Sequence, residues 1–355
     1  MTHPALRTKA CEVLGCDVPV VQTGMGFVSD SRLTAATSAA GGFGILGGVT
    51  MDFDQLRAAV KDVKERTDRP FGVNLRADQP DIRDRVDFLA AEQVRVASFA
   101  MAPTKDVVDR LHDGGVLVMP SIGAKRHAEK VADLGVDAVI AQGGEGGGHT
   151  GPVATTLLLP QVVDTLAPQG IPVIAAGGFF DGRGLVAALA YGAAGVAMGT
   201  RFVLTQESPV PAPVKRFYLE RSVLDTVVTT QVDGVPHRVL RTELVAELER
   251  GGRLRTLARA FRNAAEFHRL SGTPWMQMLK EGRDMRKRHG LTWSQVFMAG
   301  NTPILLRRAM VEGDASAGVM ASGQVVGVIE DLPSVAELVQ RLTNEAEEAL
   351  ARLGG

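Results

Sequence analysis

Residues 141–151 read AQGGEGGGHTG and set one histidine, His149, among six glycines. A glycine-rich backbone lets another molecule approach closely, because no side chain stands in the way. Histidine changes charge near neutral pH, which suits it to proton transfer and to hydrogen bonding. The segment therefore predicts a ligand-binding loop that presents His149 to a flat cofactor. The alternatives are a flexible loop with a solvated histidine and, for Glu145, either an acid–base role or a bracing role.

Two further glycine-rich stretches, AAGGFFDGRG and MGTRF, each follow an apolar run. In these stretches Gly177, Gly178 and Gly199 would leave backbone N–H groups free, and Thr200 adds a hydroxyl group. Converging N–H groups attract anions, and a helix start adds to the attraction. Because both stretches carry the feature, they predict a phosphate site. The alternative is that these glycines only make tight turns.

Two side chains at the ends of apolar runs suit contact with a heterocycle. Asn74 ends the run FGVNL, and a buried amide needs hydrogen-bond partners, which the edge of a heterocycle offers. Met25, in QTGM, has a polarizable side chain that can lie against a ring. A structural amide and an ordinary core methionine are the alternatives.

The elements that would position these residues are short apolar runs that alternate with amphipathic stretches. Such runs are typical of strands that are buried on both faces. Eight alternating strands predict an α/β fold, a (β/α)₈ TIM barrel whose ligands bind at the carboxyl ends of the strands. A doubly wound sheet is the alternative, although QTGMGFVSD lacks its dinucleotide fingerprint. The expected strands are residues 18–25, 43–48, 71–75, 95–100, 116–123, 138–144, 172–178 and 195–203.

Length and pattern predict three parts. The chain has 355 residues, more than a single core usually organises. We expect residues 1–210 to form the cofactor-binding barrel, residues 211–320 a mostly helical cap or lid, and residues 321–355 a segment that returns to the barrel. His237, His268 and His289 fall in the cap region and are weaker candidates for substrate contact.

Composition favours a cytoplasmic protein that binds a small molecule. The net charge of −1 gives no sign of nucleic-acid binding, and no apolar run is long enough for a membrane span. Cys11 and Cys16 are the only cysteines, so neither a disulfide framework nor a metal site is expected. A homodimer is the oligomeric state considered.

Several of these motifs together resemble the nitronate monooxygenase family, also called 2-nitropropane dioxygenase-like, which includes the flavin-dependent enoyl reductases of fatty-acid synthesis. The similar stretches include QTGMGFVSDSRLTAATSAAGGFGILGG, FGVNL, GGEGGGHTG, PVIAAGGFFDGRG and MASGQVVGVIEDLP, and they span nearly the whole chain. The family is an FMN-binding barrel with a helical lid. The resemblance therefore implies a flavin-dependent oxidoreductase with FMN and, as the candidate electron donor or acceptor, NADH.

The resemblance also implies roles for particular residues. His149 matches the family's active-site histidine. The residues that would line the flavin, approach its ring or take its phosphate are Gly24, Met25, Asn74, Gln142, Gly147, Gly148, Gly178, Gly199 and Thr200. The family's glycine block commonly has alanine where this chain has Gly146, a difference that bears on the substrate more than on the flavin.

Within the family, the chain looks most like an actinobacterial branch linked to late steroid-ring degradation. That likeness implies redox chemistry at an α,β carbon–carbon bond of a bicyclic acyl-CoA, with His149 transferring a proton or polarising the thioester. A nitronate monooxygenase that uses O₂ is the alternative. A barrel that binds a phosphorylated ligand without catalysis is a further alternative, from another class.

One charge pattern independently favours a CoA thioester. Residues 251–290 hold ten basic and three acidic residues, a net charge of +7 in a chain whose whole charge is −1. Arginine binds phosphate well, and coenzyme A carries several phosphate groups. The run MRKRHG, residues 285–290, is the expected contact. A solvated helical face or a surface for a partner subunit is the alternative.

Overall fold

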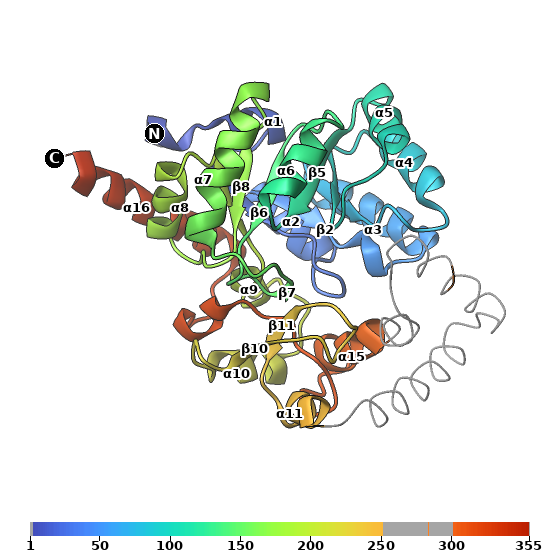
Figure 1. Ribbon diagram of the computed structural model, residues 1–355, viewed down its shortest axis with the longest axis vertical. Coiled ribbons are helices and arrows are strands. Elements are labelled where there is room, and N and C mark those ends of the chain that lie inside the picture. Colours follow the sequence, from blue (N-terminus) through green and yellow to red (C-terminus); the bar gives the residue numbers. More distant parts are fainter. Residues whose placement is uncertain (1–2, 251–282, 284–300, 355) are drawn as a thin grey trace. The chain divides into compact units, whose positions relative to one another are not determined.

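Eight parallel strands close into a barrel in the computed structural model, which describes residues 3–250, 283 and 301–354 (Figure 1). Each strand pairs with the next barrel strand along the chain, and β1 also pairs with β9 to close the ring. The eight-stranded barrel predicted from the sequence is confirmed. Its strands are β1 (Val20–Gln22), β2 (Phe43–Leu46), β3 (Gly72–Leu75), β4 (Val96–Phe99), β5 (Leu117–Ile122), β6 (Val139–Gln142), β8 (Val173–Ala176) and β9 (Gly195–Met198).

Burial on both faces explains why these strands read as continuous apolar runs. In β2 every residue is buried, and Phe43 and Ile45, two positions apart, share the face that joins the core inside the barrel. Ile140 and Ile174 meet the same core from β6 and β8. Leu14 of α1 (Lys9–Leu14) also belongs to this core, so a helix that precedes the first strand helps to fill the barrel.

Helices occupy the connections between the strands and surround the barrel. Their ends follow local capping rules; Asp52, for example, caps α3 in a capping box with Gln55. The further helices of this unit are α2 (Ser31–Ala39), α3 (Phe53–Arg66), α4 (Ile82–Ala91), α5 (Lys105–Asp113), α6 (Lys125–Ala132), α7 (Thr155–Leu166), α8 (Gly182–Ala190), α9 (Thr200–Val203) and α16 (Val335–Gly354), with the 3-10 turns η1 (Pro4–Leu6), η2 (Gly48–Thr50) and η3 (Ala167–Gln169).

The end of the chain belongs to the barrel unit, because residues 328–355 group with residues 1–146 and 150–209. Helix α16 packs against α8 and α2. A Cβ atom at Gly182, the first residue of α8, would lie only 2.3 Å from the backbone N of Ala346. The glycine therefore lets the two helices approach closely.

Residues 147–149 and 210–327 form a second compact unit. Its described part contains α10 (Ala212–Leu219), α11 (Glu243–Arg250) and α15 (Asn301–Met310), and a 3-10 turn, η4 (Gln324–Val328), ends it. It also contains a three-stranded antiparallel sheet in the order β10 (Thr226–Thr229), β11 (His237–Leu240) and β7 (Gly148–His149). We expected helices here from the sequence and did not predict this sheet.

Among the described residues, no helix combines the length and the apolar character that crossing a membrane would require.

Candidate active site

The loops after the last two barrel strands present free backbone amides. Gly177 and Gly178 follow β8 with φ angles of +89° and +87°, which side chains of L-residues rarely allow. Gly199 follows β9 and precedes Thr200, the first residue of α9. Within the described chain, the N–H groups of Gly178 and Gly199 donate no hydrogen bond. Two unpaired amides at neighbouring strand ends fit an anion such as the phosphate of a flavin nucleotide.

The loops after β1 and β3 touch each other, and the loop after β1 also approaches Gly199. A Cβ atom at Gly24 would lie 2.4 Å from the Cβ of Asn74, so glycine at this position lets the two loops touch. A Cβ atom at Gly199 would lie 3.4 Å from the Sδ of Met25, which places that methionine beside the loop after β9. Asn74 is buried, and its Nδ2 is 3.4 Å from the carbonyl oxygen of Ser98. The structure thus brings these four predicted residues together.

The glycine-rich loop after β6 is held by its own polar groups. The carboxylate of Glu145 accepts hydrogen bonds from the backbone N–H and the hydroxyl of Thr155, at 3.0 and 2.7 Å. Thr150 donates its hydroxyl to the carbonyl oxygen of Gly143 at 3.1 Å. Of the two roles considered for Glu145, this geometry supports bracing the loop.

Gly146 makes room for the side chain of Gln142, the last residue of β6. A Cβ atom at Gly146 would lie 2.7 Å from Nε2 and 2.8 Å from Cγ of Gln142. The alanine that is common in the resembling family would therefore displace this glutamine. Gly146 thus permits a particular placement of Gln142, which the sequence did not reveal.

His149 belongs to the second unit and forms a cluster there with two other residues. Its Nε2 lies 2.6 Å from Oδ2 of Asp233, and Nδ1 of His237 lies 3.3 Å from the same oxygen. The imidazole rings of His149 and His237 have centroids 4.6 Å apart. The side chain of His149 is 59% exposed, whereas those of Asp233 and His237 are 5% and 3% exposed.

Gly147 and Gly148, which precede His149, are glycine for two different structural reasons. A Cβ atom at Gly147 would lie 2.5 Å from the backbone N of Gly323, so this position packs against another segment of the same unit. Gly148 has a φ angle of +74°, and a Cβ atom at this residue would meet no other atom within 4 Å. The backbone at Gly148 is therefore open to a ligand on that side.

Asp233 carries a charge in this cluster. Burial by itself would raise the pKa of its carboxyl group, but hydrogen bonds from His149 and His237, and the charges that these rings carry when they are protonated, outweigh burial. The result is a pKa well below the usual range of an aspartate. The exposed histidine thus rests on a buried, ionised carboxylate.

The sequence analysis did not identify Asp233 and gave His237 little weight. Asp233 is four residues from His237, so local sequence could have suggested that contact. It is 84 residues from His149, so local sequence could not have suggested the other contact. The run VDGVPH contains an Asp-Gly pair, which is typical of a turn between two strands. That signal could have indicated the hairpin that brings His237 and Asp233 together.

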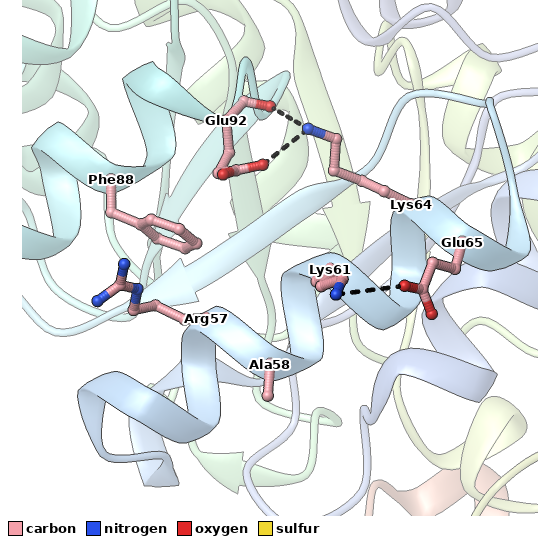
Figure 2. A pocket seen from close by; sticks show the side chains of 7 residues that line it. All are labelled: Arg57, Ala58, Lys61, Lys64, Glu65, Phe88 and Glu92. Carbon is pink, nitrogen blue, oxygen red and sulfur yellow. Dashed lines mark hydrogen bonds and ion pairs between the residues drawn. The ribbon is translucent and has the colours of Figure 1, made fainter.

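The remaining candidates lie elsewhere or outside the described residues. A groove with a volume of about 490 Å³ lies on the barrel unit, between α3 and α4, where Lys64 pairs with Glu92 and Lys61 with Glu65 (Figure 2). Since its lysines are already paired, we assign no ligand to it. His268, His289 and the run MRKRHG lie outside the described residues; Arg283 is exposed.

A closed (β/α)₈ barrel with free amides after its last two strands is the arrangement in which many barrel enzymes bind a phosphate group. A family model described as nitronate monooxygenase matches residues 7–87 and 82–345. The chain belongs to the nitronate monooxygenase family.

Individual relatives agree with this assignment. The chain is 60% identical over 341 residues, 96% of each chain, to a Mycobacterium tuberculosis protein named (3aS,4S,5R,7aS)-5-hydroxy-7a-methyl-1-oxo-octahydro-1H-indene-4-carboxyl-CoA dehydrogenase. It is 56% identical, over 98% of each chain, to a Rhodococcus jostii protein of the same name. Among solved structures, FabK from Thermotoga maritima has a TM-score of 0.79 and 34% identity, over 98% of this chain and 99% of that one.

These relationships make the chain an oxidoreductase, so the hypothesis of a barrel that only binds a ligand is not supported. Family membership also supports a flavin cofactor.

Proposed function

We propose that the chain is an FMN-dependent oxidoreductase that acts on an α,β carbon–carbon bond of a bicyclic, steroid-derived acyl-CoA. The observation that carries this proposal is the 60% identity, over 96% of both chains, to a protein named as a dehydrogenase of an octahydro-indene carboxyl-CoA. The expected polar acyl-CoA contacts in residues 285–290 remain a prediction, because that segment is outside the described residues.

FMN is proposed rather than FAD on the basis of the phosphate loops. The amides of Gly178 and Gly199 offer one anion site, and the loop after β1, QTGMG, has no dinucleotide fingerprint. In this proposal Met25, whose Sδ lies close to Gly199, and Asn74 would contact the ring system. When bound, the flavin supplies the acceptance or donation of a hydride, chemistry that no amino-acid side chain offers. NADH as the electron partner remains a prediction.

His149 is proposed as the catalytic residue that serves the substrate. Its side chain is exposed while its carboxylate partner is buried, so that the imidazole can meet a ligand and keep a fixed hydrogen bond. Thr150, the next residue in the chain, belongs to the barrel unit, and its hydroxyl is bonded to the loop after β6. The histidine would transfer a proton at the α-carbon or polarise the thioester carbonyl.

The test compares two reactions of the purified holoenzyme. We expect turnover with a bicyclic acyl-CoA or its α,β-unsaturated counterpart, and slow oxygen uptake with an alkyl nitronate. The family model's description keeps nitronate oxidation as the second candidate function. Fast nitronate-dependent oxygen uptake without acyl-CoA turnover would favour that candidate, and heat release of FAD would contradict the choice of FMN.

A further inference from the structure

The cluster of His149, Asp233 and His237 is built by the sheet of the second unit. In the antiparallel pairing of β7 with β11, His149 stands directly opposite His237. Residues that are directly opposite in such a pair project to the same face, which explains why the two rings lie side by side. Asp233 lies in the turn before β11 and places its Oδ2 between the two rings.

The shared carboxylate oxygen determines where the ring protons are. An ionised carboxylate only accepts hydrogen bonds, so the ring nitrogen nearest to it must carry a hydrogen. That nitrogen is Nε2 in His149 and Nδ1 in His237. In the neutral form of His149, the other nitrogen, Nδ1, then holds a lone pair and can accept a proton.

His237 completes the cluster as a neutral partner. Its Nε2 is buried and has no hydrogen-bond partner among the described residues. A second proton there would leave a charged, buried donor unpaired, which is costly. His237 therefore contributes a single N–H to Asp233.

A metal ion would need a different geometry. Two ligands of a tetrahedral zinc ion, each about 2.1 Å from the metal, stand roughly 3.4 Å apart. Nε2 of His149 and Oδ2 of Asp233 are only 2.6 Å apart, a separation typical of a short charge-assisted hydrogen bond. The cluster is thus a hydrogen-bonded assembly.

We propose that Asp233, supported by His237, is a positioning residue that holds His149 in its Nε2–H tautomer, so that Nδ1 acts as a general base toward the substrate. This inference rests on the proposed function and chooses proton transfer over thioester polarisation. In the oxidative direction the α-carbon–hydrogen bond breaks and the proton binds to Nδ1. The electron pair remains with the substrate as the enolate of the thioester. In the reductive direction the same proton returns to the α-carbon.

The first test reads the tautomer directly and does not depend on turnover. The holoenzyme is labelled with ¹⁵N-histidine, and the His149 signals are assigned by their loss in His149→Gln. At an alkaline pH at which the ¹⁵N shifts show a neutral ring, we expect a protonated Nε2 and an unprotonated Nδ1 in the wild type. In Asp233→Asn the amide can donate to Nε2 and favour the Nδ1–H tautomer.

The second test is kinetic and uses the bicyclic acyl-CoA. Asp233→Asn should lower kcat by up to about 10⁴-fold with a small change in KM, the size seen when a neighbouring amide imposes the wrong tautomer. Asp233→Glu should restore part of the loss. Asp225→Asn is the matched control, because Asp225 bonds the backbone of Ser222 in the same unit and lies outside the cluster.

The possible results distinguish the positioning role of Asp233 from the proposed acyl-CoA substrate. An Nδ1–H tautomer of His149 in the wild type overturns the positioning role even if Asp233→Asn does not fold. An unchanged tautomer or an unchanged kcat in a folded Asp233→Asn protein also overturns it. If the wild type shows the Nε2–H tautomer but no acyl-CoA turnover, the positioning role stands and the proposed substrate is wrong.

Discussion

At the residue scale, single glycines set the backbone conformation of the loops that follow the barrel strands. At Gly178 a Cβ atom would meet nothing nearer than Cβ of Glu145, at 3.8 Å, so no neighbouring side chain explains the glycine. Its φ of +87° and its free N–H do explain it. The residue thus combines a left-handed backbone with an unpaired amide, as our proposed phosphate site would require.

Replacement of Gly178 by alanine should therefore weaken flavin binding. The left-handed backbone would cost about 1–2 kcal/mol, and the added methyl group would crowd the amide. Loss of one hydrogen bond to a charged group, about 1.5–3 kcal/mol, corresponds to a Kd for FMN roughly 10- to 100-fold higher. Fluorescence titration of the apoprotein with FMN measures this change.

Gly170→Ala is the matched control for Gly178→Ala. Gly170 has a φ of +67°, and nothing lies within 4 Å of its Cβ position, but it precedes β8 rather than following it. Both variants should lose similar thermal stability as apoproteins. If Gly178→Ala binds FMN as tightly as Gly170→Ala does, the phosphate assignment is wrong.

Gly146 offers a second prediction, for a pair of residues. Gly146→Ala should displace the side chain of Gln142, since the new Cβ atom would lie 2.7 Å from Nε2. We expect a several-fold change in the KM for the acyl-CoA and a fold that is retained. In a Gln142→Ala background the same substitution should have no further effect, because the displaced group is absent. Additive effects of the two substitutions would contradict the steric explanation.

Among the secondary-structure elements, α7 depends on a side chain from outside the helix. Its N-cap residue, Ala154, has no side-chain acceptor, and Glu145 accepts the N–H of Thr155 instead. A carboxylate near a helix N-terminus is favourable because it satisfies an unpaired donor and complements the helix dipole. Glu145 thus joins the glycine-rich loop to the helix that follows it.

Glu145→Ala should lower the free energy of unfolding by about 1–2 kcal/mol, the usual cost of losing a helix cap. Glu145→Gln keeps a carbonyl acceptor and should lose less. Because the residue braces the loop, the shape of the pH profile of kcat should stay that of the wild type. A profile in which one ionisation disappears in Glu145→Gln would show instead that Glu145 is an acid or base. Urea unfolding and steady-state kinetics across pH provide the two readouts.

The sequence could predict the barrel strands better than the strands of the second unit. Most barrel strands are buried on both faces, as in β8 (VIAA), so they read as largely apolar runs. In β10, TVVT, and β11, HRVL, polar and apolar residues mix within four positions, and their third partner, β7, has only two residues. Such short strands are stabilised by pairing with partners that are distant in sequence. Local sequence does not reveal these partners, so it does not predict the strands.

The residues of the candidate active site also differ in how far the sequence predicts them. The positive φ of Gly178 suits the residue type itself, so a special backbone conformation there could be expected from the sequence one residue at a time. The partner of His149 could not, because Asp233 reaches it across 84 residues through a sheet that was not foreseen.

At the scale of the whole chain, a buried arginine connects the C-terminal segment to the rest of the barrel unit. Arg201, in α9, is 4% exposed, and its guanidinium donates to Oδ1 and to the carbonyl oxygen of Asp331, at 3.0 and 2.9 Å. Arg341, in α16, donates to the other carboxylate oxygen of Asp331 at 2.7 Å. One carboxylate therefore connects the loop after β9 with the C-terminal helix.

Asp331→Ala should destabilise the barrel unit more than Arg341→Ala does. Removal of Asp331 leaves the buried charge of Arg201 without its partner, a change that costs about 3–5 kcal/mol for fully buried pairs. Because the side chain of Asp331 is 43% exposed, water can enter, and we expect about 1–3 kcal/mol, near the cost of an unsatisfied polar group. Arg341→Ala removes only an exposed pair and should cost less than about 1 kcal/mol.

The pH dependence of this difference follows from the pKa of Asp331. Burial would raise the pKa, but the hydrogen bond from Arg341 and the charge of Arg201 outweigh burial and lower it. A lowered folded-state pKa gives stability that is complete above the unfolded value of about 3.9 and is lost as the pH falls through the folded value. Urea unfolding of the holoenzyme, followed by circular dichroism, should therefore show wild type and Asp331→Ala converging below about pH 4. Equal stability of Asp331→Ala and Arg341→Ala at neutral pH would mean that Arg201 does not need its carboxylate.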